Sequence, residues 1–330
     1  HYGDPGRMIA DAVGAADART VFAKVGVMQQ SLLNDTCRAI GAGELDFGVV
    51  VGGEAKYRDL RAQIAGTEAP ATPNEGTADR VMEPDDELYH DLEVEALGYM
   101  PVGYYAMMEN AFRAANGWTV AEHRDRLARL YSRFSEIAAD NPHAWKREPV
   151  APATIRDAAP GNRMLAFPYT KVHNTSWNVD QAAALLFCSV ARAQELGIPR
   201  ERWVFPRASA DSNHMLSLAQ KPDLHSLPGA RFSGEKALQL AGLGVDDIEL
   251  VELYSCFPIA VEMYGAEIGL PEGIDLTVTG GMPFAGGPLN NYVLQSTCRM
   301  AELLRRGGAR HGLLSSVSGL MTKQSFAVWS

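Results

Sequence analysis

The segment Tyr292–Gly319, YVLQSTCRMAELLRRGGARHGLLSSVSG, carries the pattern from which we predict the fold. Tyr292–Arg306 has apolar residues at helical spacing, and the two glycines that follow end the predicted helix. Leu313–Val317 is short, largely apolar and followed by a further glycine, which is typical of a buried strand. The segment therefore predicts a helix, a glycine break, a buried strand and a glycine turn.

The same order of elements occurs near the beginning of the chain. Gln29–Ala42 predicts a helix ended by glycines, and Asp46–Gly53 predicts a buried strand. Further along, Ala182–Phe187 and Ile248–Leu253 predict strands that alternate with helical stretches. We therefore expect an α/β protein with two similar halves, βαβ units and a mostly parallel sheet.

A segment of different composition separates the two halves. Glu54–Thr170 is rich in Pro, Asp, Glu and Arg and contains few continuous apolar runs. Thr119 and Glu122 have the spacing of a capping box, and the helix that follows is predicted to end at Asp140. These features predict a largely helical insertion at 54–175.

The composition excludes several classes of protein. Of 330 residues, 30 are Lys or Arg and 40 are Asp or Glu, and this net charge of −10 argues against a nucleic-acid binder. The longest apolar run, Ala182–Ala191, is shorter than the roughly 20 residues that a membrane-spanning helix needs. The cysteines form no CxxC pair, so reduced thiols in a cytoplasmic protein are expected. The histidines show no metal-binding spacing, so no metal site is predicted.

Several segments resemble thiolases in sequence and in their order along the chain. They are Val179–Ala184, Ala193–Ile198, Lys236–Leu238, Ala241–Leu243, Asp246–Ile248, Glu252, Thr279–Gly281 and Gly286–Leu289. The resemblance implies duplicated βαβαβ halves in an α/β/α/β/α layered arrangement with a helical loop-domain insertion. It divides the chain into the first part of an N-terminal half at 1–53, the insertion at 54–175, a return to the N-terminal half at 176–225 and a C-terminal half at 226–330. The opening strand and helix of the N-terminal half are expected before His1.

The residues at the expected catalytic positions differ from those of thiolases. The family uses an acyl-carrying cysteine at a helix N-terminus, a histidine in a GHP turn and a second cysteine in a CxG turn. The resemblance places these positions on Gly26, Gly287 and Val317. A fourth motif, similar to HDCF, becomes Tyr254–Phe257, with Tyr254 in place of its histidine. Other residues expected to line the pocket are Cys256, Asn290, Asn291, Ser318 and Gly319.

These changes leave more than one function open. We expect a homologue of acetyl-CoA acetyltransferases that binds an acyl-CoA or lipid thioester without thiolase turnover. The alternative is a retro-aldolase or lyase acting on acyl-CoA thioesters, similar to those that shorten steroid side chains, with Tyr254 as hydrogen-bond or proton donor. An acyltransferase using unrecognised residues is a third possibility, against which the losses at Gly26, Gly287 and Val317 weigh. Tyr254 either acts chemically or only packs, and the sequence does not separate the two.

The resemblance also indicates ligands and partners. A coenzyme A thioester is the expected ligand, and no tightly bound cofactor is expected. The insertion clasps coenzyme A in thiolases, so Arg124, Arg129 and Arg133 either meet its phosphates or form a solvated helix face with neighbouring acids. A homodimer is expected, as is a small β-domain partner that closes the cleft.

Overall fold

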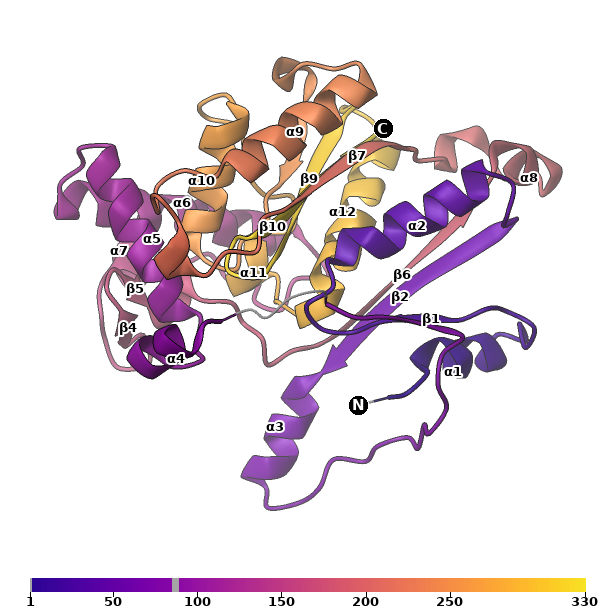
Figure 1. Ribbon diagram of the computed structural model, residues 1–330, viewed down its shortest axis with the longest axis horizontal. Coiled ribbons are helices and arrows are strands. Elements are labelled where there is room, and N and C mark those ends of the chain that lie inside the picture. Colours follow the sequence, from indigo (N-terminus) through magenta and orange to yellow (C-terminus); the bar gives the residue numbers. More distant parts are fainter. Residues whose placement is uncertain (1, 85–88) are drawn as a thin grey trace.

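The computed structural model describes residues 2–84 and 89–330, and its main sheet has four strands in the order β7–β10–β9–β8 (Figure 1). The strands are β7 (Pro206–Asn213), β8 (Leu250–Glu252), β9 (Gly312–Ser318) and β10 (Lys323–Trp329). β8 and β9 are parallel, whereas β10 is antiparallel to both β9 and β7. The expected mostly parallel sheet is therefore wrong. Residues 319–322 connect β9 to β10 as a short turn, which can join only antiparallel neighbours.

Helices cover both faces of this sheet. α9 (Pro228–Ala241) packs on β7 and β10, with α10 (Pro258–Ile268) beside it. On the other face, α12 (Tyr292–Arg306) contacts β8 and β9 and also a second sheet made of β2 (Phe47–Ala55) and β6 (Asp180–Cys188). α2 (Gln29–Gly41) lies next to α12 and packs on the second sheet, so the two helices form a central layer (Figure 1).

Two similar units, each made of one helix and one antiparallel pair of strands, share this central layer. The N-terminal unit is α2, β2 and β6, and the C-terminal unit is α12, β9 and β10; both strand pairs are antiparallel. In each unit a strand glycine lets the helix approach closely. A Cβ at Gly48 would lie 2.3 Å from Thr36 Cγ2 of α2, and one at Gly312 would lie 2.2 Å from Met300 Sδ of α12. The helices and strands predicted at both places in the sequence are confirmed.

Among the described residues, helices cover one face of the second sheet and leave the other face exposed. Its outward side chains include Val49 and Leu186, which lie opposite one another in register and are mostly exposed. The resemblance implies five layers, but the described part of the chain forms four. These are α9 with α10, the main sheet, α2 with α12, and the second sheet.

The segment between β2 and β6 is mainly helical. Its helices are α3 (Lys56–Ile64), α4 (Asp91–Leu97), α5 (Val102–Ala115), α6 (Val120–Asp140) and α7 (Pro152–Arg156). It also contributes β3 (Arg80–Met82), which pairs with β1 (Val21–Ala23), and the short strands β4 (Met164–Ala166) and β5 (Tyr169–Thr170). The capping box at Thr119 and the helix end at Asp140 are confirmed. α6 packs on α11 (Gly281–Phe284) of the glycine-rich turn, which joins this segment to the C-terminal half.

The remaining helical elements are short. They are α1 (Pro5–Ala12), α8 (Val190–Glu195) and short 3-10 turns, among them η1 (Lys171–His173) and η5 (Leu289–Asn291). Among the described residues, none of these helices or the others has the length and apolar character needed to span a membrane.

Candidate functional site

Glu252, at the end of β8, holds the glycine-rich turn in place. Its buried carboxylate accepts hydrogen bonds from the backbone N–H groups of Val278 (2.8 Å) and Thr279 (2.9 Å). The hydroxyl groups of Thr277 (2.9 Å) and Tyr292 (2.5 Å) also donate to it. Burial raises the pKa of Glu252, and these hydrogen bonds oppose the rise. The turn is thereby fixed both to the main sheet and to the first residue of α12.

Gln29, the first residue of α2, links three of the loops that the resemblance places at the site. Its side-chain Oε1 accepts from the N–H of Val293 at 2.8 Å, and its Nε2 donates to the carbonyl of Leu289 at 3.2 Å. A hydrogen bond between the Gln29 side chain and Tyr254 also affects the pKa of that phenol. Gln29 was not predicted as a site residue. The one signal in the sequence was a polar residue at the start of the helix where thiolases carry their nucleophile.

The turn after β9 approaches the loop before α2. Ser318 Oγ donates to the carbonyl oxygen of Gly26 at 2.8 Å, and the carbonyl of Gly319 faces the Tyr105 hydroxyl of α5 at 3.5 Å. Side chains alternate along a strand, so Val317 lies on the opposite face of β9 from Ser318, where it pairs with Gln324. The structure thus brings Ser318 to Gly26 and turns the side chain of Val317 away.

Tyr254 and Cys256 follow β8; the side chain of Tyr254 is buried and that of Cys256 is partly buried. The N–H of Tyr254 donates to Ser315 Oγ at 2.8 Å, and its ring packs edge-on against Tyr292. Burial is the main cause that raises the pKa of the Tyr254 phenol, so it stays protonated and able to donate a hydrogen bond. Burial also raises the pKa of the Cys256 thiol to about 12, which keeps it from forming the reactive thiolate.

At two glycines of the turn, side chains from other segments occupy the space that a Cβ atom would need. A Cβ at Gly287 would lie 2.1 Å from Thr175 Cγ2, and one at Gly281 would lie 2.5 Å from Phe134 Cδ2 of α6. The close packing of the insertion and of the segment before β6 therefore accounts for these two glycines. Asn291 is 1% exposed, and among the described residues its amide group has no hydrogen-bond partner, while Asn290 is partly exposed.

A cavity of about 490 Å³ opens beside the first turn of α2. Val27, Met28 and Ser31 line one side of it, and Asn213 and Lys323 of the main sheet line another. Gly26 adjoins this cavity through Val27, whereas Tyr254, Gly287 and Val317 lie outside its lining. The hydrogen bonds described above connect the loops of all four positions. Their convergence on one ligand cavity stays a prediction.

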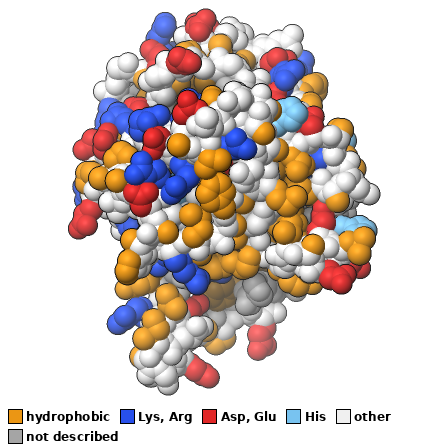
Figure 2. Space-filling model, turned by 90° about the vertical axis from the view of Figure 1, so that its left-hand side faces the viewer, with side chains coloured by type: hydrophobic (Ala, Val, Ile, Leu, Met, Phe, Trp, Pro, Cys, Tyr) orange, Lys and Arg blue, Asp and Glu red, His pale blue; other side chains and the backbone are white. Residues whose placement is uncertain are grey.

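The arginines of α6 are engaged with neighbouring groups. Arg133 forms two hydrogen bonds of 2.8 Å with the Asp275 carboxylate, which raise its pKa. Arg124 donates to the carbonyl of Arg156 at 2.7 Å, and Arg129 is exposed. Figure 2 shows basic and acidic side chains intermingled on this side of the molecule. These contacts favour a solvated, ion-paired helix face, and a role in binding coenzyme A stays a prediction.

Comparisons with known proteins agree with this arrangement. The chain is 27% identical over 180 residues to an acetyl-CoA acetyltransferase of Methanocaldococcus jannaschii, which is 54% of this chain and 43% of the relative. It is 27% identical over 207 residues to the benzoylsuccinyl-CoA thiolase subunit BbsB of Thauera aromatica, which is 60% of this chain and 47% of the relative. The matches thus span about half the length of these curated relatives. No protein-family model matches the sequence.

Solved structures cover nearly the whole chain. The crystal structure of a monomeric SCP2-thiolase-like protein type 1 from Mycobacterium smegmatis superposes with a TM-score of 0.82 at 29% identity, over 98% of this chain and 65% of that one. The Ltp2–ChsH2(DUF35) aldolase has a TM-score of 0.69 at 16% identity, over 97% of this chain and 82% of that one, and so shows the fold alone. The architecture is therefore a thiolase-like α/β fold. In sequence and in fold the chain is similar to proteins of the thiolase superfamily.

Proposed function

We propose that this chain belongs to a protein that binds an acyl-CoA or a related lipid thioester and does not carry out the thiolase reaction. The observation that carries the proposal is the start of α2. Gly26 occupies the expected nucleophile position, and Ser318 Oγ is bound to its carbonyl oxygen. A glycine supplies no side chain to attack a thioester, so the covalent acyl intermediate of thiolases is not formed there.

The protonation state of the nearest thiols supports the same proposal. Burial raises the pKa of Cys37, on α2, to about 11 and that of Cys256 to about 12. Reactive cysteines have a lowered pKa, because the thiolate is the nucleophile. At neutral pH both thiols are therefore almost entirely protonated, and neither substitutes for the missing cysteine.

A second candidate function, retro-aldol cleavage of an acyl-CoA thioester, is favoured by the placement of Tyr254. Its protonated phenol lies on the loop that meets Gln29 and the Gly287 turn. A phenol held in this way can donate a hydrogen bond to a thioester oxygen as negative charge develops on it. Tyr254 would then act as a donor and not as a base, because its raised pKa disfavours the phenolate.

The ligand and partners follow from the same proposal. The cavity beside α2 would hold the acyl group, and the exposed Arg129 would be available for a coenzyme A phosphate. The division into two halves with an insertion at 54–175, the homodimer, the small β-domain partner and the cytoplasmic location remain parts of this proposal.

Calorimetry with a panel of CoA thioesters, together with radiolabelled acetyl-CoA, tests the proposal. Binding with a Kd in the micromolar range and no acyl label on the chain is the expected result. A label that disappears in Cys37→Ala or Cys256→Ala would overturn it. For the second candidate, Tyr254→Phe should abolish lyase turnover and leave thioester binding largely intact. Tyr57→Phe, at a partly exposed tyrosine of α3, is the matched control.

A further inference from the structure

Three ligand-type side chains meet in the interior, away from the candidate site. Glu109 of α5, His123 of α6 and Glu262 of α10 each place a nitrogen or oxygen atom within 4.8 Å of the other two. Glu109 and His123 are almost wholly buried, and the side chain of Glu262 is 10% exposed. His123 Nε2 lies 2.7 Å from Glu109 Oε1. These residues were not connected by sequence reasoning, because they come from three helices that lie far apart along the chain.

Several polar atoms in this cluster have no partner. Among the residues that the structure describes, Glu262 Oε2, His123 Nδ1 and the hydroxyl of Tyr131 are buried and make no hydrogen bond. Tyr131 is near both carboxylates, since their charges contribute to the rise of its pKa. Buried polar groups are nearly always satisfied, and several unsatisfied groups in one place indicate a missing water or ion.

The charges of the cluster point to a cation. Two carboxyl groups are buried side by side, and burial raises the pKa of both, because an uncompensated buried charge is costly. The nearest arginine, Arg126, is 3.8 Å from Glu262, is about half exposed and also packs over the Trp118 ring. Arg126 is partly solvated and, among the described residues, forms its ion pair with Glu262, so it offsets the charge of two ionised carboxyl groups only in part.

We propose that Glu109, His123 and Glu262 bind a divalent transition-metal ion, with zinc the best match to one imidazole and two carboxylate ligands. Zinc–ligand bonds of about 2.0–2.2 Å in a tetrahedral site place the ligand atoms about 3.3–3.6 Å apart. His123 Nε2 and Glu109 Oε1 are 2.7 Å apart and all three ligand atoms lie within 4.8 Å of one another, so small side-chain rotations complete the site.

The place of the cluster in the fold gives the ion a structural role. α5 and α6 belong to the helical insertion, whereas α10 begins directly after the loop of Tyr254 and Cys256. The hydroxyl of Tyr169 donates to Glu109 at 2.7 Å, and its ring stacks on Phe257 of that loop. An ion bound here joins the insertion to the C-terminal half immediately behind the candidate site. It does so whether or not the proposed thioester binding is correct.

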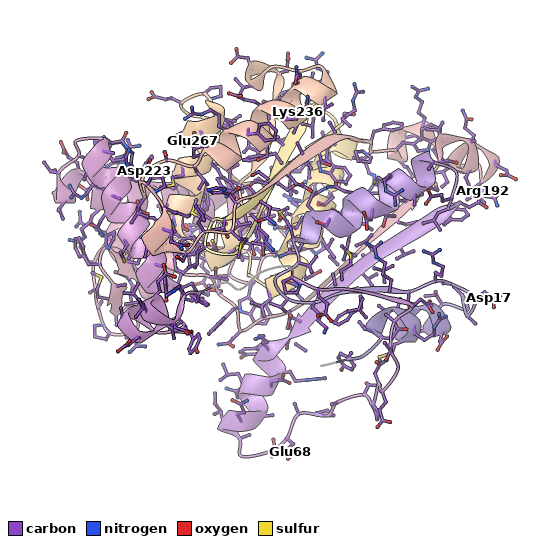
Figure 3. All side chains as sticks on the ribbon, in the orientation of Figure 1. Asp17, Glu68, Arg192, Asp223, Lys236 and Glu267 are labelled. Carbon is purple, nitrogen blue, oxygen red and sulfur yellow. The ribbon has the colours of Figure 1, made fainter. Side chains whose placement is uncertain are left out.

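Metal analysis of the full chain, purified without chelator, tests the proposal. Plasma mass spectrometry should find about one zinc ion per chain, and Glu262→Gln and His123→Gln should each lower that content about tenfold or more. Glu267→Gln is the matched control. Glu267 lies on the same helix as Glu262 (Figure 3) and its side chain is similarly buried, but it is paired with Arg231. This control should keep the metal.

A second measurement keeps the test independent of how the variants fold. Wild-type protein unfolded with chelator and refolded should gain thermal stability on addition of zinc chloride and not of magnesium chloride, because Mg²⁺ prefers oxygen ligands and retains its waters. Wild-type protein that contains no metal when purified, and whose Tm zinc does not change, would overturn the proposal. A proton shared between Glu109 and Glu262 would then hold the cluster together.

Discussion

The N-terminal and C-terminal units have the same local arrangement but differ in what covers their strands. In the C-terminal unit, β9 and β10 lie within a four-stranded sheet with helices on both faces, and nearly every residue of the two strands is buried. In the N-terminal unit, β2 and β6 form a sheet of their own, and exposed residues alternate along them with less exposed ones. Residues 56–179 lie between β2 and β6, whereas residues 319–322 alone separate β9 from β10.

This difference predicts that two units with a similar sequence pattern contribute unequally to stability. The helix–strand contacts are alike in the two units, since each relies on a strand glycine beneath its helix. The strands of the C-terminal unit bury more of their surface than those of the N-terminal unit, and burial of apolar surface is the main favourable contribution to folding. We therefore expect the C-terminal unit to carry most of the stability and to hold the site, and four predictions test this comparison.

The largest effect is expected from a matched pair of leucines. Leu314 of β9 is 1% exposed and Leu186 of β6 is 67% exposed. Leu314→Ala should lower the free energy of unfolding by about 2–5 kcal/mol, because it leaves a cavity in the core. Leu186→Ala should change it by less than about 0.5 kcal/mol. Urea unfolding measures both, and an equally large loss at Leu186 would show that the outer face of β2 and β6 is covered in solution.

The first residue of α12 gives the next largest effect. Tyr292→Phe removes the hydroxyl that donates to the buried Glu252 carboxylate and should cost about 1.5–3 kcal/mol. Tyr264→Phe is the control, since among the described residues that equally buried hydroxyl meets only the Ser316 carbonyl, at 3.4 Å, and its loss should cost less. Thermal unfolding of both variants tests the prediction. Equal losses would mean that the Glu252 network adds no more than an ordinary hydrogen bond.

The glycines beneath the two helices provide the third comparison. Gly48→Ala and Gly312→Ala should each cost about 1–3 kcal/mol, because the added methyl group has no space. Gly48→Ala should cost more, since Thr36 is β-branched and its hydroxyl is bound to the Leu32 carbonyl, whereas Met300 is flexible. Gly41→Ala, at a helical glycine with open space around it, should stabilise by up to about 1 kcal/mol. If Gly312→Ala is the costlier of the pair, the flexibility of Met300 does not relieve the contact.

The last prediction, whose effect per pH unit is the smallest, concerns His173 in the segment leading to β6. His173 Nδ1 accepts from the Thr170 N–H at 3.1 Å, and burial lowers the pKa of His173 from 6.5 to about 4. Between these values the folded protein binds fewer protons than the unfolded chain, so the free energy of unfolding should fall as the pH falls from 6.5 towards 4. The slope from this one group is at most about 1.4 kcal/mol per pH unit.

Urea unfolding across this pH range, on wild type and His173→Gln, checks the pH prediction. The variant should lose this part of the slope, and His143→Gln, at an exposed histidine, should retain it. Parallel profiles for all three proteins would show that His173 is not the group that titrates.

The sequence by itself determined the local elements and the losses at the site. Periodicity and glycines were sufficient for α2, β2, α12 and β9, because these features act within a few residues. The thiolase-like order of segments placed Gly26 and Gly287 at positions that in thiolases carry a cysteine and a histidine. The absence of a catalytic side chain can be recognised from the sequence alone, because it does not depend on which residues surround that position.

Only the tertiary structure decided which side chains meet. β10 was not predicted, since Lys323, Gln324 and Ser325 look like a polar loop until pairing with β7 and β9 buries them. The bonds from Gln29 to Leu289 and from Ser318 to Gly26 each join residues more than 250 positions apart. The cluster of Glu109, His123 and Glu262 likewise comes from three separate helices. Burial and hydrogen-bond partners depend on these distant contacts, whereas periodicity reports only on the next few residues of the chain.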